Sequence, residues 1–199
     1  MITEEQLKKA FDYQTYKQLL ESLLAQGRTT GHDQSETMLS YAKLNIQRMQ
    51  RVEKTMQVDV AVKETLQKVS KPFIWLVITE GWCGDTAQIV PVLHILAQLN
   101  PKIEFRLLLR DDNPEVMGQY LTNGARSIPK LICLEKNGLK EKFVWGPRPA
   151  ELQKMVQELM KEKVPVEEKG LMVQKWYNND QTRAIQEEIK KLAEEHLIA

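Results

Sequence analysis

The chain has 199 residues, of which 42% are hydrophobic and 28% are charged, a composition typical of a globular protein rather than a disordered or fibrous one. Its formal net charge of +1 provides neither the basic surface of a nucleic-acid-binding protein nor a polybasic membrane patch, so neither partner is expected. The first residues lack the apolar run of a secretory signal and the two cysteines stand far apart, so a reducing, cytoplasmic setting is expected.

The first seventy residues are expected to be mainly helical. Apolar residues recur at helical spacing over 7–24, before a polar loop over 27–35. A longer helical stripe follows over 38–56. It is rich in methionine, which is typical of a packing face rather than a ligand site. A further helix is expected over 62–69.

The hydrophobic pattern changes at residue 73. The uninterrupted apolar run over 73–79 predicts a strand buried on both faces. The expected elements after it are a helix over 85–99, a strand over 103–109, a short helix over 113–121, strands over 130–135 and 140–144 around an Asn137-Gly138 turn, a helix over 150–161, a connector after Pro165 and a last helix over 185–196. This order predicts an α/β fold with a parallel first pair of strands and an antiparallel second pair.

Cys83 stands where the strand over 73–79 opens into the following helix. Free amides and the dipole at a helix N-terminus favour an anion such as a thiolate. The pKa of Cys83 is therefore predicted to lie below that of a free cysteine. Gly84 leaves room for another chain to approach the sulfur, and Trp82 supplies an apolar platform beside it.

Several short motifs around this position resemble those of bacterial-type thioredoxins. Trp82-Cys83-Gly84-Asp85-Thr86 stands in place of the family's Trp-Cys-Gly-Pro-Cys element, and Pro91 falls where the family carries the proline that kinks its active-site helix. Arg126-Ser127-Ile128-Pro129 is similar to the family's Arg-Gly-Ile-Pro segment, and Asn137-Gly138 matches the turn of its last hairpin.

The resemblance covers residues 59–162 and implies a thioredoxin-like fold, a mixed central sheet flanked by helices. Residues 1–58 are then expected to form an N-terminal helical extension. Residues 163–199 are expected to form a C-terminal helical extension that packs on the domain.

The resemblance also implies roles for single residues. Cys83 matches the family's nucleophile, while Ile128 and Pro129 match the loop that pairs with a bound peptide or mixed-disulfide partner, with a cis bond at Pro129. Two parts of a thioredoxin are missing, because Thr86 replaces the second cysteine and Val77 stands where the family has a buried carboxylate. Ordinary dithiol chemistry is therefore excluded at this site, and a monothiol site is expected.

Neighbouring groups are expected to tune this thiol. The Thr86 hydroxyl is expected to donate a hydrogen bond to the Cys83 sulfur, and Lys130 to add positive charge nearby. Asp85 is interpreted as a helix-start residue, although its carboxylate also opposes a neighbouring anion. The predicted partner groove consists of Trp82, Gly84, Asp85, Ile128, Pro129 and Lys130.

The remaining candidate residues have simpler interpretations. Cys133, within an apolar run, is interpreted as a core residue rather than a resolving cysteine. His94 is interpreted as packing or facing solvent, and with His32 and His196 it forms no zinc-binding spacing, so no metal and no cofactor are expected. Arg148 lies in a strand-to-helix junction near the predicted groove, where it can contact a partner.

These observations leave more than one function open. The first is thiol–disulfide exchange through mixed disulfides at Cys83, resolved by an external thiol, with protein or low-molecular-weight thiols and disulfides as partners. The alternative is a redox-inactive protein-binding module that keeps the groove. A third, iron–sulfur binding by a monothiol glutaredoxin-like dimer, is less favoured because of Trp82 and the proline loop. Substrate, reductant and oligomeric state stay open.

Overall fold

The computed structural model describes residues 2–198. The N-terminal part is helical, as expected, and its helices are α1 (Glu4–Lys8), α2 (Tyr13–Ala25), α3 (Glu36–Thr55) and α4 (Val60–Gln67). Each begins at a residue whose side chain accepts hydrogen bonds from the first free amides, which fixes where the helix starts. These N-caps are Thr3, Asp12, Ser35 and Asp59.

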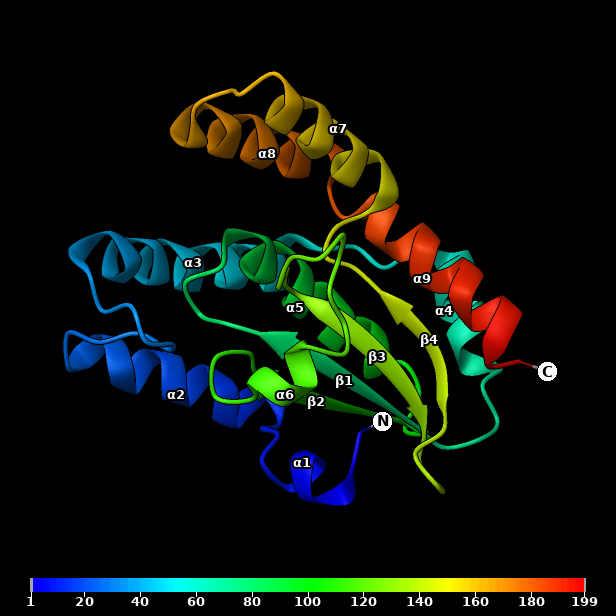
Figure 1. Ribbon diagram of the computed structural model, residues 1–199. Helices are drawn as coiled ribbons and strands as arrows, with labels where there is room; N and C mark the ends of the chain where they lie inside the picture. The colour runs from blue at the N-terminus through cyan, green and yellow to red at the C-terminus, as the bar shows by residue number, and fades with distance from the viewer. Residues whose placement is uncertain (1, 199) are drawn as a thin grey trace.

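A mixed sheet of four strands lies at the centre of the described chain (Figure 1). Its strands are β1 (Phe73–Thr79), β2 (Ile103–Leu109), β3 (Lys130–Glu135) and β4 (Glu141–Trp145). The order across the sheet is β2-β1-β3-β4, with β1 parallel to β2 and the other pairs antiparallel. The predicted α/β fold, with its parallel first pair and antiparallel second pair, is confirmed.

In the described part of the chain, five further helices follow the first strand. They are α5 (Gly84–Ala97), α6 (Pro114–Met117), α7 (Ala150–Lys161), α8 (Val166–Asp180) and α9 (Arg183–His196). The expectation of a connector after Pro165 was wrong, because α8 occupies most of that segment. Apolar residues such as Val166 and Leu171 remain exposed on α8, so a single apolar stripe did not mark this helix in the sequence.

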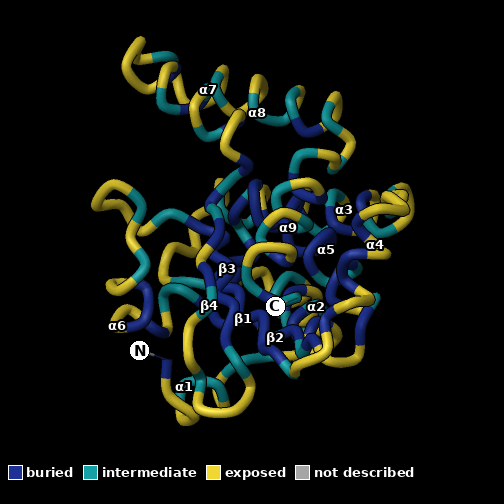
Figure 2. Tube along the Cα trace, turned by 90° about the vertical axis from the view of Figure 1, so that its right-hand side faces the viewer, coloured by how far each residue is buried: buried dark blue, intermediate teal, exposed yellow. Residues whose placement is uncertain are grey.

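The two faces of the sheet support separate cores. Along β1, Trp75 and Val77 point into a large core shared with α2–α5 and α7–α9, whereas Leu76 and Ile78 point into a smaller core that includes residues of α6. All of β1 is buried, as expected for a strand covered on both faces. Figure 2 shows this buried centre beneath more exposed helices.

The two last helices differ in how they pack. Helix α9 lies along α4 and β4, and its Ile185 and Ile189 are fully buried in the large core. Glu188 on α9 accepts hydrogen bonds from the Trp145 indole at 2.6 Å and from the amide of Ala150 at 2.7 Å. It therefore holds the end of β4 and the start of α7 together. Helices α7 and α8 form a hairpin that projects from the body (Figure 1).

Candidate active site

Cys83 occupies the N-cap of α5, directly after the turn that ends β1. Its thiol donates a hydrogen bond of 3.5 Å to the carbonyl oxygen of Ile128, in the loop that leads into β3. Only 8% of the residue is exposed, and it packs in the smaller core beside residues such as Ile78. The sulfur therefore lies at the end of the sheet, between the start of α5 and the proline loop.

The prediction of a lowered pKa at Cys83 was wrong. Burial raises the pKa of the Cys83 thiol, and the Asp85 carboxylate raises it further, while hydrogen bonds from the backbone and side chain of Thr86 act in the opposite direction. The helix N-terminus favours an anion, but the loss of water around the sulfur outweighs that effect here. The resting site holds a protonated thiol.

Lys130 makes its hydrogen bonds with the loops around it. Its ammonium group donates to the hydroxyl of Thr122 at 2.5 Å and to the carbonyl of Gly146 at 2.8 Å, so it points toward the loops around the sheet rather than at Cys83. Burial lowers the pKa of Lys130 to about 8. Its role in the structure is to join two loops, which sequence position alone did not reveal.

Cis peptide bonds occur in the loop before β3, which contacts the thiol, and in the loop after β4. The Ile128–Pro129 bond is cis, as the resemblance implied, and the Gly146–Pro147 bond is cis as well, which the sequence did not indicate. Gly146 has a φ of 104°, and a Cβ placed on it would lie 2.5 Å from the carbonyl oxygen of Pro129. The two proline loops therefore pack so closely that only glycine fits between them.

Asp85 is buried and bonded on both of its oxygens. The Arg148 guanidinium forms an ion pair of 2.6 Å with Oδ2, and the Tyr177 hydroxyl donates a hydrogen bond of 2.8 Å to Oδ1. Asp85 is thus more than a helix-start residue, because it joins α5 to the loop before α7 and to α8. Sequence reasoning missed Tyr177, since no pattern in the chain connects two positions so far apart.

Helix α3 supports the turn that carries the thiol. The buried Asn45 amide donates to the carbonyl of Gly81 at 3.0 Å, and the Arg48 guanidinium donates to Asn45 Oδ1 at 3.0 Å. Arg48 also lies against Gly84, where an added Cβ would be 3.4 Å from Nη1. Asn45 belongs to the stripe predicted as a packing face, but Arg48 was not recognised as a site residue.

Trp82 forms the other wall beside Cys83. The guanidinium of Arg110 lies over its ring, 4.7 Å from the centroid, and is held there by a 2.8 Å ion pair with Asp111. The preceding Gly81 amide donates to the hydroxyl of Thr30 at 2.8 Å. The Trp82 ring is therefore in contact with Arg110, and the loop between α2 and α3 is bonded to the turn that precedes Cys83.

The second cysteine lies on the opposite face of the sheet. Cys133 and Val77 are both fully buried in the large core, whereas Cys83 packs in the smaller one. Both cysteines are free thiols, and burial raises the pKa of Cys133 to about 12. The interpretation of Cys133 as a core residue agrees with this placement, and the strands of the sheet separate it from Cys83.

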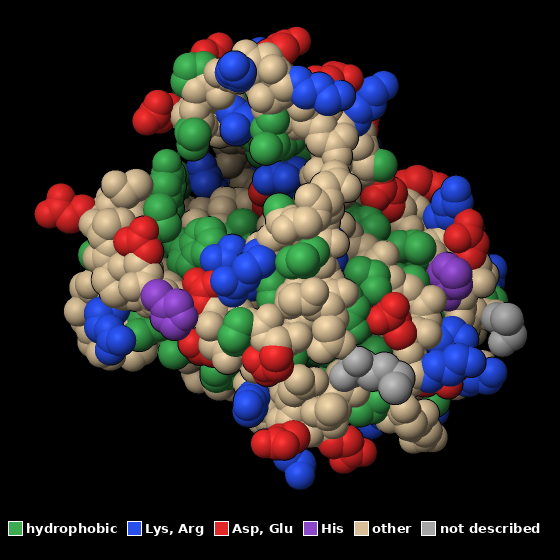
Figure 3. Space-filling view, viewed as in Figure 1, with side chains coloured by type: hydrophobic (Ala, Val, Ile, Leu, Met, Phe, Trp, Pro, Cys, Tyr) green, Lys and Arg blue, Asp and Glu red, His purple; other side chains and the backbone are tan. Residues whose placement is uncertain are grey.

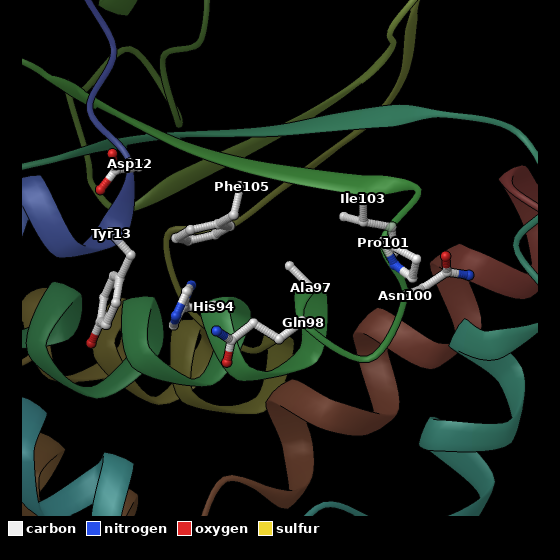
Figure 4. Close-up of a pocket in the computed structure, with 9 residues that line it drawn as sticks. All are labelled: Asp12, Tyr13, His94, Ala97, Gln98, Asn100, Pro101, Ile103 and Phe105. Atoms are coloured by element: carbon white, nitrogen blue, oxygen red, sulfur yellow. The ribbon is translucent and has the colours of Figure 1, made fainter.

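A cavity of about 260 Å³ lies away from this site, at the far end of α5 (Figure 4). Its wall includes His94, whose ring stacks on Tyr13 with centroids 4.0 Å apart and an interplanar angle of 19°. Burial lowers the pKa of His94, so it is neutral near neutral pH. His94 packs, as interpreted, and is remote from the thiol.

Between residues 2 and 198, no three His, Cys, Asp or Glu side chains gather in a way that would hold a metal ion. Over the same range, no helix combines the length and apolar character that crossing a bilayer requires.

Comparison with known proteins adds to this geometry. The family model described as thioredoxin matches residues 31–162. The chain is similar to two solved structures, a protein of unknown function from Pseudomonas aeruginosa (15% identity) and an HIV epitope-scaffold (16% identity), each with a TM-score of 0.61 and 98% of both chains covered. At these identities the two structures show a shared fold alone. No curated protein matches the sequence significantly. Because the family match spans more than half of its residues, the chain belongs to the thioredoxin family.

Proposed function

We propose that this protein carries out monothiol thiol–disulfide exchange, with Cys83 forming mixed disulfides that an external thiol resolves. The observation that supports this most is the pairing of the Cys83 thiol with the carbonyl of Ile128, next to cis-Pro129. A lone thiol then faces the loop that, in the family, pairs with a mixed-disulfide partner. A cytoplasmic setting would keep this thiol reduced and supply the resolving thiol.

The reaction has two balanced steps. In the first, Cys83 loses its proton to solvent, and the thiolate attacks one sulfur of a disulfide. A new bond forms from Cys83 to that sulfur, the old S–S bond breaks, and the other half leaves as a thiolate that takes up a proton. In the second step an external thiolate attacks the mixed disulfide, regenerates Cys83 and leaves with the bound half as a disulfide. Cys133 has no part in either step, because it lies on the other face of the sheet.

The raised pKa of Cys83 makes the first step slow at neutral pH, since little thiolate is present at rest. The rate of exchange is therefore limited by the small fraction of thiolate and should increase with pH. The same burial favours the second candidate, a binding module in which Cys83 is only a packing residue, because just 8% of Cys83 is exposed.

Intact-mass spectrometry after incubation with hydroxyethyl disulfide separates the two candidates. The wild-type protein and Cys133→Ser should each gain one hydroxyethylthio adduct that dithiothreitol removes, and Cys83→Ser should gain none. Peptide mapping should place the adduct at Cys83, and circular dichroism should show that each variant is folded. If Cys83 reacts only after denaturation, exchange is wrong and the binding module is supported.

A further inference from the structure

We propose that the Cys83 site selects small disulfides and thiols that carry carboxylates, with Arg48 as the residue that recognises the negative charge. This deepens the exchange reaction proposed above and rests on it. The geometry points to an anion because, among the described residues, only Arg148 of the three arginines Arg48, Arg51 and Arg148 forms an ion pair with a carboxylate.

Arg48 is the first of these cations. It lies against Gly84, the residue next to Cys83, and it is partly buried. Within residues 2–198 it forms no salt bridge, and its hydrogen bond goes to the neutral side chain of Asn45. The carboxylate of Asp85 attracts its charge, but from beyond ion-pair distance. Withdrawing a guanidinium from water without a directly bonded carboxylate is costly, and a bound carboxylate would offset that cost through paired N–H···O bonds.

Arg148 is a second positive charge near the thiol. It pairs with Asp85, and its charge is near enough to interact with a Cys83 thiolate. Its Nε is buried and, among the described residues, has no hydrogen-bond partner. Since Tyr177 also donates to Asp85, the single carboxylate at the start of α5 is already fully used by Arg148 and Tyr177.

Arg51 extends the positive region along α3. It stands one turn after Arg48 and donates to the neutral side chain of Gln88 at 2.9 Å, and it too forms no salt bridge in the described part of the chain. It lines a cavity of about 640 Å³ between α3, α5 and the α8–α9 junction. Arg48, Arg148 and the positive end of α5 thus share the carboxylate of Asp85, while the cavity lined by Arg51 also contains Asp59.

The shape of this region favours a small ligand. Helix α8 covers the start of α5 through the Tyr177–Asp85 hydrogen bond, and Figure 3 shows a hollow between the projecting α7–α8 hairpin and the body, with basic side chains on its walls. A hollow of this kind accommodates a low-molecular-weight disulfide better than it accommodates the extended surface of another protein. Its carboxylate would lie near Arg48 while its sulfur meets Cys83.

The test compares three small disulfides of different charge: dithiodipropionate, which is anionic, neutral hydroxyethyl disulfide and cationic cystamine. Rates of adduct formation at Cys83 are measured at low salt, and each is divided by the rate of the same disulfide with the urea-unfolded protein, which removes intrinsic reactivity. The expected order is anionic, neutral, cationic, and added salt should reduce the differences.

Arg48→Gln should lower the ratio of the anionic to the neutral rate by about tenfold, the size expected when one hydrogen bond between charged groups is lost. The ratio is used because removing Arg48 changes thiolate formation for every disulfide alike. The matched control is Lys43→Gln, which removes an exposed cation on the same helix and should leave the ratio unchanged.

Equal normalised rates, or an unchanged ratio in Arg48→Gln, overturn the anion preference while exchange at Cys83 still stands. If no disulfide reacts, the exchange proposal is wrong, and the preference for anions is then tested by a binding measurement alone. Dithiodipropionate added to Cys83→Ser should shift the Arg48 Nε–H resonance in an NMR titration, and hydroxyethyl disulfide should not. No shift with dithiodipropionate overturns the proposal without reference to the reaction.

Discussion

The Tyr177 hydroxyl donates a 2.8 Å hydrogen bond to Oδ1 of Asp85, and this bond joins positions 92 residues apart in the chain. Asp85 stands two residues after the thiol, and Tyr177 is the buried residue of α8. The C-terminal part of the chain therefore contacts the first turn of the helix that carries Cys83. We therefore expect access to the sulfur to depend on the position of α8.

Replacing Tyr177 by Phe tests the coupling. The loss of a hydrogen bond to a buried carboxylate should lower the free energy of unfolding by about 1.5–3 kcal/mol, which corresponds to a fall in Tm of roughly 3–12 °C. Iodoacetamide should also modify native Cys83 several-fold faster, because α8 is held less firmly. Thermal melts and peptide-mapped alkylation measure the two effects. Tyr41→Phe, at an exposed tyrosine of α3, is the control and should change neither. An unchanged alkylation rate in Tyr177→Phe would show that α8 does not limit access.

The pH dependence of Cys83 alkylation tests the electrostatics of the site. Burial and the Asp85 carboxylate raise the pKa of Cys83, so the alkylation rate should keep increasing with pH beyond the value of about 8.5 that is usual for free cysteine. Asp85→Asn removes the neighbouring negative charge and leaves Arg148 without its anion. The midpoint of the profile should therefore move to lower pH, and the rate at neutral pH should rise. Asp112→Asn, at an exposed carboxylate, should leave the profile unchanged. A wild-type midpoint at or below that of free cysteine would contradict the raised pKa.

A pair of glycine substitutions tests the contact between the two proline loops. Gly146→Ala places a Cβ 2.5 Å from the Pro129 carbonyl oxygen at a φ of 104°, so it should destabilise the protein by about 3 kcal/mol and lower Tm by roughly 6–12 °C. Gly170→Ala, in α8 with open space around it, should instead stabilise by up to about 1 kcal/mol. Urea unfolding followed by circular dichroism measures both. Equal stabilities for the two variants would mean that the loops separate easily.

Much of the fold was predictable because its signals are local. The apolar run over 73–79 is the strand β1, the helix expected over 150–161 is α7, and the Asn137-Gly138 turn joins β3 to β4. Each depends on residues close together in sequence, where periodicity and turn chemistry decide the structure. Helix α8 was missed because its apolar residues Val166 and Leu171 do not face the core.

The candidate site was less predictable because its energetics depend on distant residues. Cys83 and cis-Pro129 could be located from motifs. The direction in which the Cys83 pKa is shifted could not be predicted, because it depends on burial in the folded chain rather than on the helix end alone. The partners of Lys130 lie in loops, and Arg48 reaches the site from α3. No spacing rule within the active-site segment encodes such contacts.

The contacts of Glu188 predict the effect of truncating this protein. Glu188 holds Trp145 and Ala150, which flank the loop that bears Arg148, and Arg148 in turn meets Asp85. A fragment cut at the limits of the family match, 31–162, would lose Glu188 and, with it, the brace that aims the guanidinium. Grafting the Trp-Cys-Gly-Asp-Thr motif into another thioredoxin should likewise transfer the sulfur without its electrostatic surroundings, because Arg48, Arg148 and Tyr177 lie outside the motif.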